Sequence, residues 1–182
     1  MSEITPLMPR KPVPDLSLPL AGGGTWSLAA DKGDSFTLLV FYRGLHCPIC
    51  KRYLNQLQSL LPEFEKRGVS VVAVSTDDRE RAEKTKADWG LGDLAIAYGL
   101  ELADARKWGL YVSTGRGKTS IGLDEPDLFA EPGLFFVKPD GTLYFGSVQT
   151  MPFARPPLAD LPGALDFVIK ADYPARGEVE AI

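Results

Sequence analysis

The motif Cys47-Pro48-Ile49-Cys50 constrains this chain most, because it holds both cysteines of the 182-residue sequence. It lies between an apolar, β-like run at 36–42 and a helical pattern. A C-x-x-C at a strand-to-helix junction is typical of a redox dithiol. The start of a helix presents unpaired backbone N–H groups and the positive end of the macrodipole, and both stabilise a thiolate, the reactive form of cysteine. The motif therefore predicts reactive thiols at the end of a strand.

Two other uses of a cysteine pair compete with this interpretation. A structural disulfide here would close a very short loop, which restricts the unfolded chain little and adds little stability. Zinc needs four ligands, whereas this chain has no second cysteine pair and one histidine, His46. Zinc binding would therefore require a site shared between two chains. A hydrolase is disfavoured because its base would be His46, which directly precedes Cys47 and is poorly placed to pair with it.

The composition indicates one globular domain over residues 1–182, since 45% of the residues are hydrophobic and 24% are charged. The net charge of −4 and the pI of about 5.1 argue against a nucleic-acid partner. Residues 1–10 lack the apolar core of a signal peptide, and no apolar run reaches the length of about 18 residues that spans a membrane. We therefore expect a cytoplasmic protein, in which a lone cysteine pair is usually catalytic or metal-binding.

Hydrophobic periodicity predicts strands that alternate with helices. We expect buried strands at 36–42 and 69–75, a short extended segment at 94–98, and hairpins at 15–28 and 134–148. The expected helices cover 48–67, 76–89, 101–108 and 158–171. Gly68 ends the first helix, and Pro48 fits its first turn because an N–H there would be unpaired. Residues 1–14 are expected to form an extended arm, 109–131 an irregular segment, and 173–182 a loose tail.

This order of elements predicts a mixed central β-sheet flanked by helices. Strands that alternate with helices pair in parallel through right-handed crossovers, and the closing hairpin adds antiparallel strands. The C-x-x-C then lies at the C-terminal end of a central strand, which is the edge where open α/β sheets place their sites. The residues therefore indicate the α/β class, with an N-terminal β-hairpin.

The string Phe41-Tyr42-Arg43-Gly44-Leu45-His46-Cys47-Pro48-Ile49-Cys50 resembles the FYRG-x-x-C-P-x-C signature of the peroxiredoxin-like branch of the alkyl hydroperoxide reductase/thiol-specific antioxidant (AhpC/TSA) family. The hairpin at 15–28 and the turn Pro139-Asp140-Gly141 are also similar to this family, so that the resemblance spans about residues 12–172. It implies the thioredoxin fold and a thiol-dependent antioxidant oxidoreductase that requires no metal or organic cofactor.

Two ungapped comparisons assign different roles to the cysteines. The peroxiredoxin pattern P-x-x-x-[TS]-x-x-C places the peroxidatic cysteine at Cys50, which puts Cys47 at the Thr/Ser position and Arg43 at the Pro position. Cys47 would then resolve the Cys50 sulfenic acid by forming a disulfide. The thioredoxin pattern instead makes Cys47 the nucleophile and Cys50 the resolving thiol. It also expects a buried acid near Val40, which this sequence lacks.

Two further segments extend the resemblance. Pro132, in Glu131-Pro132-Gly133, stands where thioredoxins carry a cis-proline beside the dithiol, so a cis bond is expected here. The segment Met151–Arg155 resembles the peroxiredoxin segment that delivers an arginine to the active site. A guanidinium there lowers the pKa of the thiol and can hydrogen-bond a peroxide oxygen. Arg155 is therefore a candidate catalytic residue, and Arg43 is a second candidate that adds to it or replaces it.

Three functions remain open at this point. The first is reduction of hydrogen peroxide or organic hydroperoxides through a Cys47/Cys50 cycle, with an external reductant such as a thioredoxin-like protein. The second is a disulfide reductase in which Cys47 attacks protein partners, and the third is a non-enzymatic redox sensor. The attacking sulfur should be the more exposed and the more acidic one. A homodimer is expected by analogy.

Three remaining signals are interpreted as structural. Residues 114–119 suggest a phosphate loop, but a Walker A motif needs glycine where Val112 stands. The mixed charge run at 77–81 is expected to be a solvated start of a helix, where its acids suit the dipole. His46 is expected to be a surface or loop residue.

Overall fold

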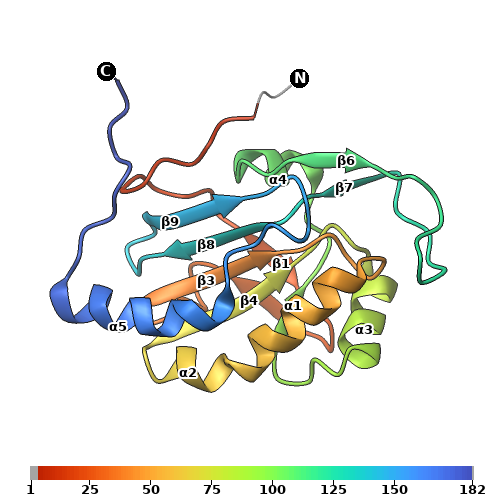
Figure 1. Cartoon of the computed structure of the whole chain (residues 1–182), viewed down its shortest axis with the longest axis horizontal. Helices are drawn as coiled ribbons and strands as arrows, with labels where there is room; N and C mark the ends of the chain where they lie inside the picture. The colour runs from red at the N-terminus through yellow and green to blue at the C-terminus, as the bar shows by residue number, and fades with distance from the viewer. Residues whose placement is uncertain (1–3, 182) are drawn as a thin grey trace.

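The computed structural model describes residues 4–181, and its centre is a five-stranded mixed sheet (Figure 1). The strand order is β5-β4-β3-β8-β9. β3 pairs in parallel with β4, and β4 with β5, whereas β8 runs antiparallel to β3 and to β9. The bounds are β3 Phe36–Phe41, β4 Val69–Val74, β5 Ala95–Ala97, β8 Gly133–Val137 and β9 Leu143–Val148. The expected mixed α/β sheet is confirmed.

Two small hairpins lie outside this sheet. β1 (Ser17–Pro19) and β2 (Thr25–Ser27) form the expected N-terminal hairpin. β6 (Val112–Thr114) pairs with β7 (Leu128–Ala130), so the segment expected to be irregular is partly β-structure. The sequence does not show this pairing because each strand is short and residues 115–127 separate the two. Short runs without a tight turn give no hairpin signal.

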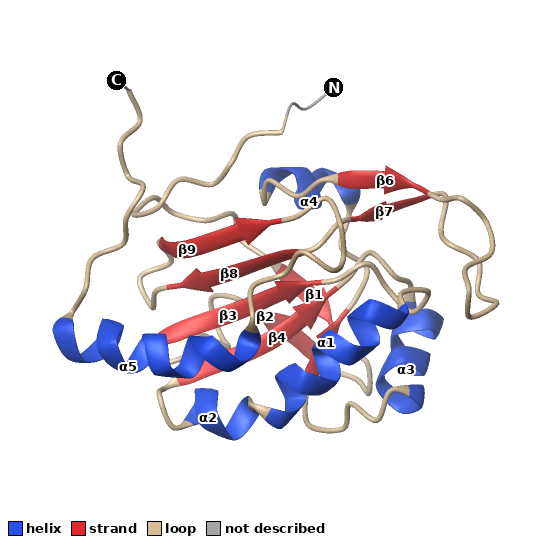
Figure 2. Cartoon of the chain, in the orientation of Figure 1, coloured by secondary structure: helices blue, strands red, loops and turns tan. Residues whose placement is uncertain are grey.

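Residues 4–181 also form five α-helices, and Figure 2 shows α1, α2 and α5 covering the same face of the sheet. Their bounds are α1 Pro48–Ser59, α2 Leu61–Glu65, α3 Arg79–Asp88, α4 Leu102–Lys107 and α5 Leu161–Ala171, with a 3₁₀ turn at Leu158–Asp160. The single helix expected at 48–67 is divided at Leu60. Pro62 explains the break, because it has no N–H to donate and its ring crowds the preceding turn.

The central strand β3 is buried along its whole length and supplies both sides of the core. Leu38 and Val40 belong to the cluster under α1 and α2, whereas Leu39 and Phe41 belong to the cluster on the opposite face. On that opposite face the ring of Phe41 lies 5.4 Å from the ring of Trp108, measured between centroids. A strand buried on both faces is held rigidly, so the residues that follow it are held at a defined position.

The N-terminal arm lies along the edge strand β9. The Arg10 amide donates to the Leu143 carbonyl at 2.8 Å, and Pro12 forms an isolated bridge with Thr142. Residues 173–181 have no regular secondary structure. Ala175 is nevertheless buried, and its carbonyl accepts two hydrogen bonds from the Arg10 guanidinium. The N-terminal arm and the C-terminal segment are therefore bound to each other at this point.

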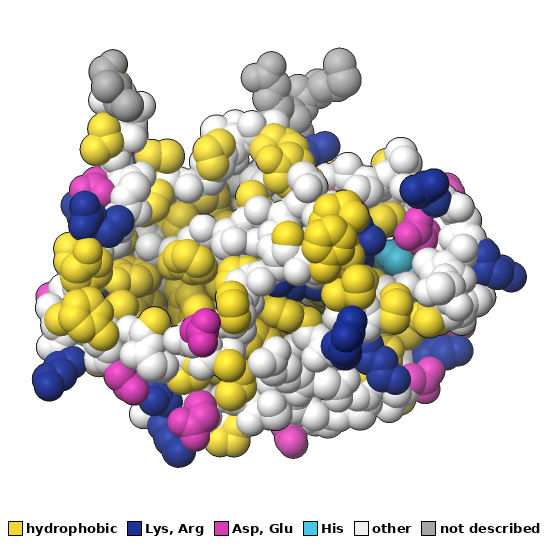
Figure 3. Space-filling view, in the orientation of Figure 1, with side chains coloured by type: hydrophobic (Ala, Val, Ile, Leu, Met, Phe, Trp, Pro, Cys, Tyr) yellow, Lys and Arg dark blue, Asp and Glu magenta, His cyan; other side chains and the backbone are white. Residues whose placement is uncertain are grey.

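Apolar side chains gather on the face that carries β8, β9 and α5, as Figure 3 shows. Among the large exposed apolar residues, Phe145 lies on β9, Phe167 and Ile169 lie on α5, and Tyr173 follows α5. Within residues 4–181 no helix is long and apolar enough to cross a bilayer.

Candidate active site

The two cysteines lie where β3 ends and α1 begins, as the sequence predicts. Cys47 is the N-cap residue of α1 and has extended backbone angles. Its sulfur accepts a hydrogen bond from the Cys50 amide at 3.3 Å, which satisfies one of the unpaired N–H groups of the first turn. Both thiols are free and buried, with exposed fractions of 4% for Cys47 and 0% for Cys50.

Arg155 reaches the Cys50 sulfur from the loop that follows β9. Its Nη2 donates to Cys50 Sγ at 2.9 Å, and its Nη1 donates to the Pro152 carbonyl at 2.5 Å. The guanidinium lies over the ring of Tyr53 on α1, 4.9 Å from the centroid. The Tyr53 hydroxyl in turn donates to the Pro156 carbonyl at 2.8 Å. These contacts hold the guanidinium against the sulfur, where the resemblance predicted an arginine.

The environment of each sulfur makes Cys50 the acidic one. Burial alone raises the pKa of Cys50, but the hydrogen bond from Cys47, the charge of Arg155 and its hydrogen bond lower that pKa to about 6. The hydrogen bond that Cys47 gives to Cys50, together with burial, raises the pKa of Cys47. The pair is therefore stable with a thiolate at Cys50 and a neutral thiol at Cys47.

Arg43 pairs with a buried carboxylate at the edge of the site. Its Nε and Nη2 donate to the two carboxylate oxygens of Glu131 at 2.7 and 2.9 Å, and the Ser113 hydroxyl donates to the same carboxylate at 2.6 Å. The Arg43 guanidinium carbon lies 5.5 Å from the centroid of the Phe129 ring. Arg43 is thus committed to Glu131, whereas Arg155 makes the direct contact with Cys50.

The expected cis bond before Pro132 is wrong, because every peptide bond between the described residues is trans. Trans is the intrinsic preference even before proline. Backbone hydrogen bonds hold the segment in this form: the Glu131 amide donates to Tyr111 at 2.8 Å, and the Pro132 carbonyl accepts from Gln149 at 3.0 Å. Pro132 therefore directly precedes β8 and follows Glu131, the partner of Arg43.

His46 lies in the loop between β3 and α1, but it and Asp77 are both buried, each with 1% of its surface exposed, so neither lies at the surface as expected. Arg81 donates from Nε to Asp77 at 2.9 Å, and its Nη2 lies 3.2 Å from His46 Nδ1. Burial, with the nearby charge of Arg81, lowers the pKa of His46 to about 4. His46 is therefore neutral near pH 7 and does not supply a positive charge to Cys47. Burial also raises the pKa of Asp77, although the Leu45 amide and Arg81 lower it.

The sequence interpretation missed Glu131, Arg81 and the burial of Asp77. A signal was present for Glu131, since a single charge inside the apolar run 128–137 is rarely buried without a partner. Asp77 follows a buried parallel strand, and sites of α/β sheets collect at that edge. Arg81 carried no signal, because its role depends on the three-dimensional approach of α3 to residues 43–47.

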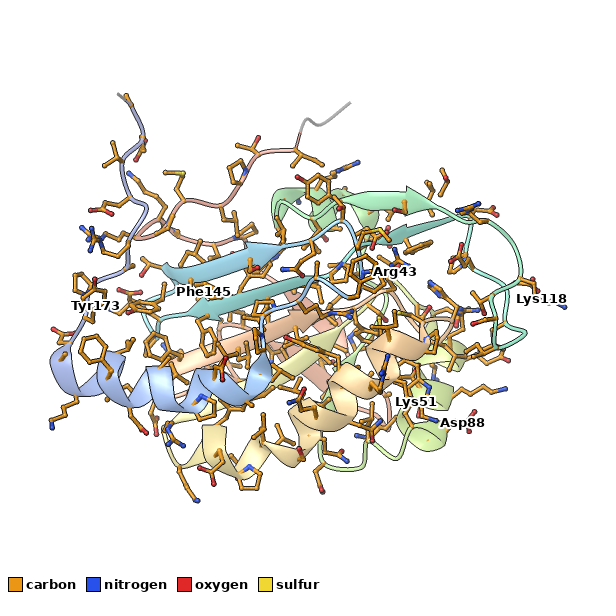
Figure 4. The ribbon with its side chains drawn as sticks, in the orientation of Figure 1. Arg43, Lys51, Asp88, Lys118, Phe145 and Tyr173 are labelled. Carbon is orange, nitrogen blue, oxygen red and sulfur yellow. The ribbon has the colours of Figure 1, made fainter. Side chains whose placement is uncertain are left out.

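An open groove with a volume of about 630 Å³ adjoins the site on the side of Arg43. Figure 4 shows Arg43 above the first turn of α1 and Lys118 at the tip of the loop between β6 and β7. Polar and apolar groups share the lining, which includes Arg43, Ser113, Arg116, Glu125, Phe129 and Met151. Residues 4–181 contain no cluster of three or more His, Cys, Asp or Glu side chains placed to hold a metal ion.

Comparison with known proteins agrees with this geometry. The model of the AhpC/TSA family matches residues 9–145. The chain belongs to the AhpC/TSA family. This membership confirms the resemblance and the expected enzyme class, a thiol-dependent oxidoreductase of the peroxiredoxin type. The match spans the hairpin, the C-x-x-C and the sheet as far as β9, and it ends before Arg155.

Solved structures show the same fold. The peroxidoxin BcpB from Mycobacterium tuberculosis has a TM-score of 0.67 and 21% identity, over 87% of this chain and 96% of that one. A PrxQ mutant from Xylella fastidiosa has a TM-score of 0.66 and 16% identity, over 93% and 99% of the two chains. A bacterioferritin comigratory protein from Xanthomonas campestris, 23% identical with a TM-score of 0.61, covers 86% and 91%. A search of curated proteins found no match.

Proposed function

We propose that this AhpC/TSA protein is a peroxidase that reduces hydrogen peroxide or organic hydroperoxides through a Cys47–Cys50 dithiol–disulfide cycle. The observation that supports this most is the contact of 2.9 Å between Arg155 Nη2 and the Cys50 sulfur. A thiolate with a pKa of about 6 is the dominant form near pH 7 and is the nucleophile that peroxide reduction needs. Alkyl peroxide reduction is the activity described for the bacterioferritin comigratory protein from Xanthomonas campestris, which agrees with this chemistry.

In the first step the Cys50 thiolate attacks one oxygen of the peroxide and the O–O bond breaks. The sulfur becomes a sulfenic acid, and the other oxygen leaves as an alkoxide or hydroxide that takes up a proton from water. Arg155 can assist, because its Nε–H is buried without a hydrogen-bond partner among the described residues and shares an edge of the guanidinium with Nη2. This donor is free for a peroxide oxygen beside the sulfur.

In the second step the Cys47 thiol attacks the Cys50 sulfenic acid, a disulfide forms and water leaves. An external dithiol, such as that of a thioredoxin-like protein, then returns the pair to the reduced state by thiol–disulfide exchange, and is itself oxidised. Cys47 thus has two roles in the proposal. It donates a hydrogen bond to the Cys50 thiolate before the reaction, as a threonine hydroxyl at its position would, and it resolves the sulfenic acid afterwards.

A disulfide reductase with Cys47 as the nucleophile is the second candidate. The exposed fractions favour it slightly, since Cys47 is the less buried sulfur. The pKa values and the Arg155 contact favour Cys50, and we give them more weight because only a thiolate attacks. A redox sensor would use the same thiols without turnover. The homodimer, the external reductant and the cytoplasmic location stay predictions.

The test is stopped-flow tryptophan fluorescence of the reduced protein mixed with hydrogen peroxide. We expect oxidation about a thousandfold faster than that of a free thiol, loss of the fast phase in Cys50→Ser, and its retention in Cys47→Ser. Cys47→Ser should stop at the sulfenic acid, which mass spectrometry detects. Oxidation of the wild type at the rate of a free thiol would overturn the peroxidase proposal. A fast phase lost only in Cys47→Ser would support the reductase.

A further inference from the structure

Asp77 binds the backbone of the loop that precedes Cys47. The Leu45 amide donates to Asp77 Oδ2 at 2.7 Å, and Arg81 Nε donates to Asp77 Oδ1 at 2.9 Å. Both carboxylate oxygens therefore act as acceptors, and the side chain is fully buried. A buried carboxylate is costly unless both oxygens are satisfied. The proposed catalytic steps use neither Asp77 nor Arg81, so the reaction itself does not explain this pair.

Arg81 extends the contact to two other segments. Its Nη2 lies 3.2 Å from His46 Nδ1, and its Nη1 donates to the carbonyl of Asp124 at 3.3 Å. A guanidinium can only donate, so His46 Nδ1 accepts and the ring proton is on Nε2. One guanidinium from α3 thereby contacts three groups. They are the Asp77 carboxylate that holds Leu45, the ring of His46 next to Cys47, and the backbone of Asp124 in the loop between β6 and β7.

The fit of Asp77 against the loop is tight. Gly44 has a φ of 132°, and a Cβ built on it would lie 2.6 Å from Asp77 Oδ1. The Gly44 carbonyl accepts from the Cys47 amide at 3.1 Å, which closes the turn onto the N-cap position. A shift of residues 44–45 would therefore move Cys47. Cys50 is held separately, by α1 and by Arg155.

We propose that Asp77, acting through its bonds to Leu45 and Arg81, is a positioning residue that sets the placement of Cys47 relative to Cys50. The inference rests on the proposed Cys47–Cys50 cycle and assigns Asp77 to its second half. Asp77 touches neither sulfur. It governs how often the Cys47 thiol lies in line for attack on Cys50, whereas the Cys50 thiolate is also stabilised by Arg155, which Asp77 does not contact.

Asp77→Asn tests this with almost no change in shape. The carboxamide has one oxygen, so its NH₂ group must face one of two donors, the Leu45 amide or Arg81 Nε. The probe is dithiodipyridine, a neutral disulfide. Each attack by a protein thiol releases one thiopyridone, whose absorbance is followed with time. Cys50 attacks the probe and releases one, and Cys47 then attacks the mixed disulfide, forms the Cys47–Cys50 bond, and releases the second together with its proton.

We expect Asp77→Asn to slow the second release about tenfold or more and to slow the first much less, because Arg155 still stabilises the Cys50 thiolate. Asp78→Asn is the matched control: Asp78 is the neighbouring carboxylate and the N-cap of α3, a position where asparagine is equally good. Both release rates should then match those of the wild type. Cys47→Ser should give the first release alone.

Arg81→Gln is the second variant, and it removes the partner of Asp77 from a half-buried position. It should also slow the second release, and the effects of the two variants should not add in the double variant. Arg81→Lys should restore part of the rate, because an ammonium replaces only one of the three contacts. Equal slowing of both releases, or no slowing of the second, would overturn the inference. Because no peroxide is used, failure of the peroxidase proposal would be seen separately.

Discussion

Cys47 and Cys50 are the same chemical group, and their different pKa values arise from what surrounds each sulfur. Cys50 receives a hydrogen bond from Cys47 and another from Arg155, whereas Cys47 is a donor to a thiolate. Ionising Cys47 would remove the proton that it donates to the Cys50 sulfur, so this hydrogen bond raises the pKa of Cys47. The same arrangement keeps Cys47 protonated until Cys50 has been oxidised, and only then is Cys47 free to attack.

Arg155→Met should raise the pKa of Cys50, because burial remains and the charge and hydrogen bond that oppose it are lost. In the wild type, the ultraviolet absorbance of the thiolate should rise with pH around a midpoint of about 6. We expect the midpoint of the variant to lie about 1–3 pH units higher, and its peroxide reaction near pH 7 to slow at least about tenfold. Arg52→Met, on the exposed side of α1, is the control. An unchanged midpoint in Arg155→Met would contradict the role of Arg155.

At the scale of the elements, the loop between β3 and α1 depends on a conformation that side chains rarely adopt. Gly44→Ala should therefore destabilise the protein, through strain at a φ of 132° and through a Cβ that meets the Asp77 carboxylate. Gly90→Ala is the matched control, since Gly90 also has a positive φ but open space around it. In denaturant unfolding we expect Gly44→Ala to lose about 2 kcal/mol more than Gly90→Ala. Equal losses would show that the contact with Asp77 is loose.

The elements that carry their own pattern could be predicted from the sequence. The apolar run of β3, the leucine spacing of α1 and the C-x-x-C between them place the dithiol correctly. The burial of His46 and Asp77 could not be predicted in this way, because it depends on Arg81 approaching from α3. Local sequence shows that a run of residues is charged, but it does not show whether one of those charges is buried. Burial depends on partners that are distant in sequence.

Arg155 is also distant in sequence from its partner Cys50, but in this case the contact was predicted. Nothing in the periodicity of residues 149–157 indicates contact with Cys50, and the prediction came from resemblance to peroxiredoxins. The cis bond at Pro132 came from resemblance to thioredoxins and is wrong. The family whose model matches residues 9–145 was therefore a better guide to the site than the superfamily that shares its fold.

On the scale of the whole molecule, the N-terminal arm and the C-terminal segment meet at Arg10 and Ala175. Figure 4 shows Tyr173 at one end of the molecule, with Phe145 between it and Arg43. Arg10 binds the Ala175 carbonyl through Nε at 2.9 Å and Nη2 at 2.7 Å, and it also pairs with Glu178 at 3.2 Å. The N-terminal arm is thereby fixed against the C-terminal segment beside β9, and stability can be changed there without disturbing the sulfurs.

Arg10→Ala should lower the free energy of unfolding by about 1–2 kcal/mol, because charge-assisted hydrogen bonds to a half-buried carbonyl are lost. Lys11→Ala is the matched control: its pair with Glu180 is exposed on both sides, so the loss should stay below about 0.5 kcal/mol. Denaturant unfolding measures both. The pH midpoint of Cys50 should be unchanged in either variant, since Arg155 and Cys47 still set it. A shifted midpoint in Arg10→Ala would mean that the terminal contacts are coupled to the site, and that the two ends of the sheet do not behave independently.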